Sequence, residues 1–215
     1  MTNFIFSILI LILSVVAHEL AHGYAAHALG DNTAERAGRL TLNPLAHLEW
    51  FGSFILPVIS YLLGGFIIGW AKPVPYNPYN LRNQRWGELL VALAGPAMNV
   101  AIALVFGLFL RFVVPSDAIL YIVSNIVFIN LLLATFNLVP IPPLDGSKIL
   151  FSLFPNKLYD LRIKFEKYSF ILVVLFVVFL WQYMAPVVGG EFHLITGWCS
   201  SLTRILYLLY CTQFS

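Results

Sequence analysis

The sequence predicts an all-α polytopic membrane protein: a helical transmembrane bundle with a re-entrant hairpin and short extended or β pieces on its cytoplasmic side. Of the 215 residues, 60% are hydrophobic and only 10% are charged, and the mean hydropathy is +0.86. Apolar runs near the length that crosses a bilayer recur along the chain, and basic residues gather in the loops between them. Residues 1–215 contain no internal repeat or low-complexity linker, so we expect a single membrane-embedded domain.

The first apolar segment runs from about Phe4 to Leu29 and ends at a turn-forming Gly-Asp-Asn sequence. The polar stretch 31–50 follows, and we expect a short strand or hairpin over Thr33–Leu42. Because basic residues lie on this side, the positive-inside rule places the N-terminus outside the cell and the polar stretch in the cytoplasm.

The apolar stretch 51–70 is just long enough to span a membrane, but Pro57 and the Gly64-Gly65 pair interrupt it. Basic residues flank both of its ends, which places both ends in the cytoplasm. A re-entrant hairpin that is shielded by protein satisfies this better than a true span, although the sequence leaves the span open. The flanking basic residues are Arg36, Arg39, Lys72, Arg82 and Arg85.

Later apolar segments are expected to complete the bundle. The predicted spans are about Leu89–Phe109, Ala118–Val139 and Ser169–Val188. The tail over Leu194–Tyr210 is short, and it is either a last span or an interfacial helix. Within the first of these spans, Gly95 would let a neighbouring helix approach closely, and Pro96 implies a kink or a helix start nearby.

A metal-site motif lies inside the first apolar segment. His18, Glu19 and His22 form the pattern H-E-x-x-H. Residues four apart lie on one face of a helix, so the two imidazoles can bind one metal ion. Glu19 projects from the next position, where its carboxylate can reach a water molecule rather than the metal. Ionisable groups are costly in an apolar helix, which supports a zinc hydrolase site over a chance match.

A catalytic zinc ion needs a third protein ligand. His27 lies five residues after His22 and thus on the wrong face of the helix, and His193 is expected on the opposite side of the membrane. Asp145 is the best candidate, because it follows a proline-rich turn on the same side as the end of the first segment. The alternative is that Asp145 caps the following helix. The full set of candidates is His27, His47, Glu49, Asp145 and His193.

Three motifs, in order and with their spacing, resemble those of the site-2 protease family of intramembrane metalloproteases. They are His18-Glu19-Leu20-Ala21-His22, Gly95-Pro96-Ala97-Met98-Asn99 and Asn137 followed by Pro143-Leu144-Asp145-Gly146. The resemblance extends from the first segment to about residue 155. It includes Asn43-Pro44 and Lys72-Pro73-Val74-Pro75, which are typical of compact bacterial and archaeal members. This chain has no room for the PDZ or CBS domain that many members add.

The resemblance implies the roles of individual residues. His18, His22 and Asp145 would hold one Zn²⁺ per chain, and Glu19 would act as the general base. Asn137 would hydrogen-bond the oxyanion or the substrate backbone. Asn99 is a weaker candidate for binding substrate backbone, with hydrogen bonding between helices as the alternative.

The predicted function is regulated intramembrane proteolysis, in which peptide bonds within or next to transmembrane segments of membrane proteins are hydrolysed. The expected location is the cell membrane, with the active site opening toward the cytoplasm. An unwound substrate would pair with stretch 51–70 or with the loop 72–79. The partners are membrane-protein substrates and the lipid bilayer; no regulatory partner is indicated, and the net charge of +2 is too small to indicate nucleic acid.

Two other functions use the same residues. One is a membrane zinc hydrolase that acts on a non-protein amphiphile, and the other is a metal transporter. A transporter predicts further His, Asp or Glu residues along the spans. The segments Leu89–Phe109 and Ser169–Val188 contain none, which argues against transport.

Overall fold

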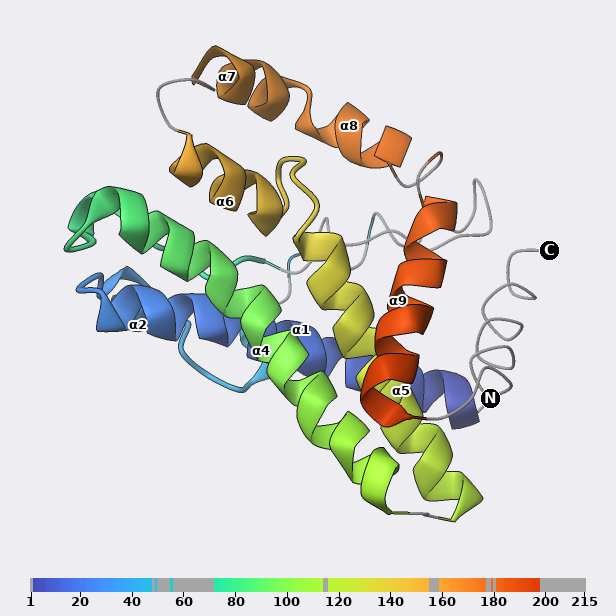
Figure 1. Ribbon diagram of the computed structural model, residues 1–215. Helices are drawn as coiled ribbons and strands as arrows, with labels where there is room; N and C mark the ends of the chain where they lie inside the picture. Colours follow the sequence, from blue (N-terminus) through green and yellow to red (C-terminus); the bar gives the residue numbers. More distant parts are fainter. Residues whose placement is uncertain are drawn as a thin grey trace.

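The computed structural model describes residues 2–47, 49, 55, 72–113, 116–154, 159–176, 179 and 181–197. Within these ranges all regular structure is helical, in agreement with the predicted fold class (Figure 1). The α-helices are α1 (Thr2–Ala28), α2 (Thr33–Arg36), α4 (Gln84–Phe112), α5 (Asp117–Asn137), α6 (Asp145–Leu153), α7 (Tyr159–Lys167), α8 (Ser169–Leu175) and α9 (Trp181–Thr196). Two short 3₁₀ helices, η1 (Pro44–His47) and η3 (Pro78–Asn80), lie in the loops.

In the described part of the chain, three helices are long and apolar enough to cross a membrane. They are α1 over Phe6–Ala28, α4 over Trp86–Phe112 and α5 over Asp117–Asn137. These helices confirm the first three predicted spans, and each of them packs against the other two. In Figure 1 the helices α6, α7 and α8 lie together at one end of this bundle, where α1 ends and α4 begins.

Helix α4 begins at Gln84 and continues through Pro96 without ending. The side chain of Asn83 accepts a hydrogen bond of 3.1 Å from the backbone N–H of Trp86, which caps the helix well before the proline. A helix start near Pro96 is therefore wrong. The proline removes one backbone donor within an otherwise complete helix.

The predicted fourth span, Ser169–Val188, is not one uniform element. Helix α8 ends at Leu175, and α9 extends to Thr196, beyond the apolar run. The extension contains Glu191, whose carboxylate accepts a hydrogen bond of 3.0 Å from the Thr135 hydroxyl on α5. This contact gives the Glu191 carboxylate a hydrogen-bond partner inside the bundle. A prediction from hydropathy excludes charged residues, so it ended the segment before Glu191.

The packing of α9 on the bundle comes from a cluster of buried apolar side chains. They come from α4, α5 and α9: Ala103, Leu110, Val123, Val127, Leu131, Val188 and Phe192. The α9 side chains pack against both α4 and α5, and Ile195 lies against Gly107. The cluster therefore holds α4, α5 and α9 together.

The expected strand or hairpin over Thr33–Leu42 is wrong, because this stretch begins with the short helix α2. The Asp31 carboxylate accepts hydrogen bonds from the backbone N–H of Thr33, at 3.1 Å, and from its hydroxyl, at 2.5 Å. Such local side-chain bonds compete with strand pairing. Residues 72–77 form no regular secondary structure, and the extended or β pieces expected on the cytoplasmic side stay a prediction.

Two predictions fall on parts of the chain that the structure does not describe. The re-entrant hairpin over 51–70 lies, apart from Ile55, outside the described residues. The tail over Leu194–Tyr210 lies outside them from residue 198 onward.

Candidate metal centre

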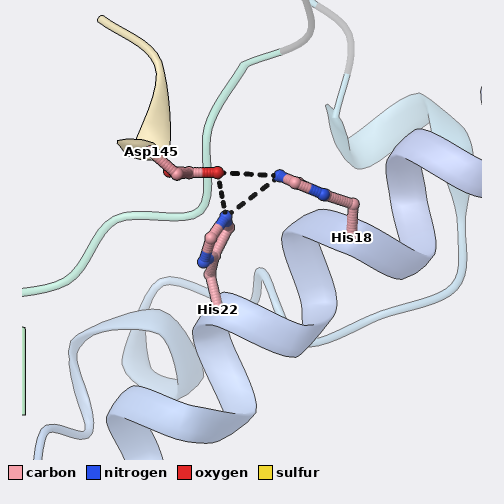
Figure 2. A group of neighbouring side chains, drawn as sticks. All are labelled: His18, His22 and Asp145. Carbon is pink, nitrogen blue, oxygen red and sulfur yellow. Dashed lines mark hydrogen bonds and ion pairs between the residues drawn. The ribbon is translucent and has the colours of Figure 1, made fainter. Parts of the chain in front are cut away.

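The two histidines of the H-E-x-x-H motif and Asp145 meet at one point. His18 and His22 project from α1, and Asp145 approaches them from the start of α6 (Figure 2). The Oδ2 atom of Asp145 lies 3.1 Å from Nε2 of His18 and 3.0 Å from Nε2 of His22, and the two Nε2 atoms are 3.1 Å apart. All three side chains are buried. In the described part of the chain this is the only cluster of three His, Cys, Asp or Glu residues close enough to share a metal ion.

Asp145 is the first residue of α6, and Leu144 occupies the N-cap position. The interpretation of Asp145 as a helix cap is therefore wrong. The turn that brings it to the histidines requires the next residue to be glycine, because a Cβ at Gly146 would lie 2.5 Å from the carbonyl oxygen of Val139 and closer still to that of Leu138. Gly146 thus lets α6 start directly against the end of α5.

Burial by itself would raise the pKa of the Asp145 carboxyl. The contacts with His18 and His22, together with the positive charge of Lys148, outweigh burial and hold this pKa well below its usual range. The Lys148 ammonium lies 3.3 Å from Oδ1 of Asp145, the carboxylate oxygen that faces away from the histidines. The group therefore presents an ionised carboxylate oxygen to the two rings.

The outer nitrogens of both rings are engaged by acceptors. Nδ1 of His22 donates to the carbonyl oxygen of Val91 at 2.6 Å, and Nδ1 of His18 lies 2.5 Å from Oδ1 of Asn99. A neutral ring that donates from Nδ1 carries a lone pair on Nε2. Two such lone pairs and a carboxylate oxygen that converge on one point form a cation site.

The donors and their spacing fit a zinc ion. Nitrogen and oxygen ligands lie about 2.0–2.1 Å from tetrahedral zinc, so they are separated from each other by about 3.3 Å. The three observed separations of 3.0–3.1 Å are close to this value. Two histidines and one carboxylate are also a ligand set of catalytic zinc sites, which keep a fourth position open.

Helix α4 approaches this point through Gly95. A Cβ at this position would lie 2.6 Å from Nε2 of His18 and closer still to Nε2 of His22. Such contacts are too short for any real side chain. The prediction that Gly95 permits a close approach is confirmed, and the neighbours that approach it are the two imidazoles.

Glu19 is held by a loop that lies beside α1. Its Oε2 atom accepts a hydrogen bond of 2.8 Å from the backbone N–H of Val74. Gly23 makes room for this loop, since a Cβ there would lie 2.9 Å from Cγ1 of Val74 and 2.5 Å from Cδ2 of Leu40. The buried Asp31 fixes the loop further along, where its Oδ2 accepts the Asn77 N–H at 2.6 Å.

The loop 72–77 has few backbone donors left for a substrate. The N–H of Lys72 donates to the carbonyl oxygen of His47, the N–H of Val74 to Glu19 and the N–H of Asn77 to Asp31. The two prolines in the loop have no N–H. At most one further N–H, that of Tyr76, remains for the strand pairing expected from the sequence.

The two asparagines expected at the site lie in different surroundings. Asn137 is the last residue of α5 and half-buried, and its Nδ2 donates to the carbonyl oxygen of Leu133 at 2.9 Å. Asn99 is fully buried, and both ends of its amide are engaged: Oδ1 by His18, and Nδ2 by Oδ1 of Asn130 at 2.8 Å. A role for either residue in substrate binding stays a prediction.

The other candidates for the third ligand lie elsewhere. His27 is exposed at the end of α1 and forms an ion pair of 3.5 Å with Glu35. His47 is buried, and its Nε2 lies 3.0 Å from the carbonyl oxygen of Thr41. Glu49 and His193 are not members of the metal-ligand cluster either.

Sequence reasoning did not assign a role to several residues that surround the site. Ser14 lies four residues before His18, and this spacing places both on one helix face. Lys148 lies three residues after Asp145, which is also a same-face spacing in α6. Asn130 is one of three asparagines in an apolar helix, and nothing in the sequence distinguishes it from Asn125.

Comparisons with known proteins agree with this site. The model of the family described as "Peptidase family M50" matches residues 6–125 and 113–180. "Putative zinc metalloprotease YwhC" of Bacillus subtilis (strain 168) is 38% identical over 188 residues, which cover 82% of each chain. "Putative zinc metalloprotease Rip2" of Mycolicibacterium smegmatis is 38% identical over 139 residues, 63% of this chain and 52% of that protein. "Putative zinc metalloprotease MJ0611" of Methanocaldococcus jannaschii is 34% identical over 153 residues, 67% of this chain and 72% of that protein. No solved structure matches the chain.

The helical bundle, the convergent site and these similarities define a zinc metallopeptidase, with Zn²⁺ as its cofactor. Its apolar helices make it a membrane protein. The chain belongs to peptidase family M50, which confirms the resemblance to the site-2 proteases.

Proposed function

We propose that this metallopeptidase hydrolyses peptide bonds within or next to the transmembrane segments of membrane-protein substrates. The observation that carries the proposal is the placement of His18 and His22, two of the three ligands, on α1, one of the helices that can cross a membrane. At 1.5 Å per residue, His22 lies about 9 Å and His18 about 15 Å from the end of α1 at Ala28. A catalytic centre at this depth acts on segments that enter the membrane.

In this proposal His18, His22 and Asp145 hold the zinc ion. The two rings are fixed by acceptors at Nδ1, so each presents Nε2 to the ion. Zinc in such a site acts as a Lewis acid toward a peptide carbonyl and makes a neighbouring water molecule easier to deprotonate.

Glu19 is the proposed general base. It takes a proton from the attacking water and later delivers it to the nitrogen of the leaving amine. The Val74 N–H holds Oε2 of Glu19 and leaves Oε1 for proton transfer. The bond therefore orients the carboxylate without occupying both of its oxygens.

Asn137 is proposed to hydrogen-bond the developing oxyanion or the substrate backbone. Its Nδ2 donates to Leu133 on its own helix. The NH₂ group carries a second hydrogen, which is the donor proposed to meet the substrate.

We place the protein in the cell membrane. In the proposed orientation, the end of α1, the start of α4 and helices α6 and α7 face the cytoplasm. Basic residues at this end support it under the positive-inside rule. A pocket of about 410 Å³ opens at the same end, and its lining includes Glu88, Arg162, Glu166 and Lys148, the last of which contacts Asp145. The charged side chains in this lining suit the entry of water.

The substitution Glu19→Gln tests the mechanism, because it removes the base and leaves the three metal-ligand residues intact. Cleavage of single-span membrane proteins should fall by about 10²–10⁴-fold while zinc content stays at the wild-type value. Glu35→Gln is the control, since Glu35 is exposed on α2 and forms its ion pair with His27, which is not a member of the metal-ligand cluster.

The same assay separates the competing functions. Undiminished proteolysis by Glu19→Gln would refute the role of this carboxylate. Hydrolysis of a non-protein amphiphile without peptide cleavage would favour the alternative zinc hydrolase. Zinc uptake into proteoliposomes that survives Glu19→Gln would favour the transporter.

A further inference from the structure

A chain of buried hydrogen bonds connects the metal centre to the middle of α5. Nδ1 of His18 lies 2.5 Å from Oδ1 of Asn99, and Nδ2 of Asn99 donates to Oδ1 of Asn130 at 2.8 Å. Nδ2 of Asn130 donates to the carbonyl oxygen of Ile126 at 2.8 Å and to the Ser14 hydroxyl at 2.9 Å. Both asparagines are fully buried, so the chain joins α1, α4 and α5 in the interior of the bundle.

The donor and the acceptor of each hydrogen bond between His18 and Asn130 can be assigned from the bond at the Ile126 carbonyl. The Ile126 carbonyl can only accept, so Asn130 must turn its NH₂ group toward it and its oxygen toward Asn99. Asn99 must then donate from Nδ2 and present its oxygen to His18. His18 can meet that oxygen only with a proton on Nδ1, which leaves the Nε2 lone pair directed at His22 and Asp145.

We propose that Asn99 and Asn130 are positioning residues that fix the tautomer and the ring orientation of His18 for zinc binding. The proposal rests on the role of His18 as a zinc ligand. An acceptor at the outer nitrogen of a ligating histidine orients the ring and raises its basicity. The two oxygens of a carboxylate are equivalent, whereas an amide that is flipped exchanges its oxygen and its NH₂ group. A second group is therefore needed to fix the orientation of Asn99, and Asn130 is that group.

The two histidines differ in this respect. His22 donates directly to a backbone carbonyl, that of Val91, so its tautomer is fixed by the fold of α4. His18 depends on two side-chain amides, and the second of them does not touch the metal centre. Substitution of Asn130 should therefore weaken zinc binding from a distance, through His18 alone.

The buried setting makes the wrong orientation costly. A reversed Asn99 amide would place NH₂ against the Nδ1–H of His18 and oxygen against the oxygen of Asn130, and both groups would lose a hydrogen bond away from water. Without Asn130, a flipped Asn99 amide is penalised only at the end that faces His18. The ring of His18 is then free to take the other tautomer, in which Nε2 carries the proton and cannot bind zinc.

The test measures zinc affinity by chelator competition with the purified full chain in detergent, for Asn99→Leu and Asn130→Leu. Each should bind zinc about 10–100-fold more weakly than wild type. Asn125→Leu is the matched control, because Asn125 is equally buried in α5 and donates to the carbonyl four residues back, that of Tyr121. It should bind zinc like wild type. Thermal unfolding of the metal-free variants shows how far each substitution alters the fold.

His18→Ala separates failure of this inference from failure of the proposed site. Wild-type zinc affinity in His18→Ala would overturn the ligand assignment and the proposal with it. Loss of zinc in His18→Ala, combined with wild-type affinity in Asn99→Leu and Asn130→Leu, would overturn the proposal alone. Equal weakening by Asn125→Leu and Asn130→Leu would also overturn it.

A second measurement needs no substitution and so does not depend on the folding of a variant. Nitrogen-15 NMR of the histidine side chains, at an alkaline pH where the rings are neutral, distinguishes the two tautomers. The metal-free wild-type protein should show the proton of His18 on Nδ1. A proton on Nε2 would overturn the proposal.

Discussion

A single methyl group on Gly95 should weaken zinc binding by displacing the two imidazoles. A Cβ at this position would lie 2.6 Å from both Cε1 and Nε2 of His18, and even closer to Nε2 of His22. The rings cannot move away freely, because Nδ1 of His18 is hydrogen-bonded to the side chain of Asn99 and Nδ1 of His22 to the carbonyl oxygen of Val91. Gly95→Ala therefore forces a choice between moving α4 and moving the ligands.

The structure sets the size of the effect. Ordinary contacts of a Cβ begin at about 3.4 Å, so the His18 ring must withdraw by roughly 0.8 Å. Metal sites tolerate deviations of about 0.2 Å in ligand distance. We expect zinc affinity to fall by about 10–100-fold, as it does when the groups that orient a ligand are removed.

The metal-free protein should lose about 0–2 kcal/mol of stability. Alanine favours a helix over glycine by about 1 kcal/mol, and overpacking costs about 1–3 kcal/mol. These two effects oppose each other.

Gly190→Ala is the control for this substitution. Gly190 lies inside α9, and among the described residues an added Cβ meets nothing within 4 Å apart from its chain neighbours and the backbone of its own helix. It should raise the free energy of unfolding by about 0.5–1 kcal/mol and leave zinc affinity unchanged. Chelator competition and thermal unfolding measure both quantities for both variants. Wild-type zinc affinity in Gly95→Ala would refute the close approach of α4 to the histidines.

Three further predictions address the third ligand, the loop beside Glu19 and the topology. Asp145→Ala should lower zinc occupancy as well as activity, whereas His27→Ala should leave occupancy near wild type; full zinc in Asp145→Ala would mean that the ligand is wrong. Burial raises the pKa of Asp31, but hydrogen bonds to its carboxylate outweigh burial and hold the pKa below 3.8. Asp31 therefore stabilises the loop fully above about pH 4, and this stabilisation is lost as the pH falls through the lowered pKa. Hydrogen exchange of the loop should show this pH dependence in the wild-type protein. The same pH dependence in Asp31→Asn would contradict the assignment to Asp31. Cysteines at positions 36 and 72 should be labelled from the same side of the membrane, and labelling from opposite sides would show that 51–70 is a true span.

The spans and the paired histidines were predictable because both are local properties of the chain. The length of an apolar run decides whether a helix can cross a bilayer, and three such runs became α1, α4 and α5. The four-residue spacing of His18 and His22 places them on one face of any helix. Neither feature depends on what packs against it.

Other features depended on partners that are distant in sequence. Asp145 lies 123 residues from His22, and its position in the sequence favours a ligand only modestly over a helix cap. The packing of α6 against α4, with Gly146 at the turn, decided that its carboxylate meets the histidines. The extent of α9 was likewise decided by the contact of Glu191 with Thr135.

The sequence by itself determined the membrane helices, the H-E-x-x-H motif and the family resemblance. Only the tertiary structure decided how the buried amides are used. Asn99, Asn125 and Asn130 are alike as polar residues in apolar helices, yet Asn125 bonds within its own helix while the other two connect to His18. The physical reason is that an amide offers a donor at one end and an acceptor at the other, and only its neighbours in space fix which end faces the metal centre.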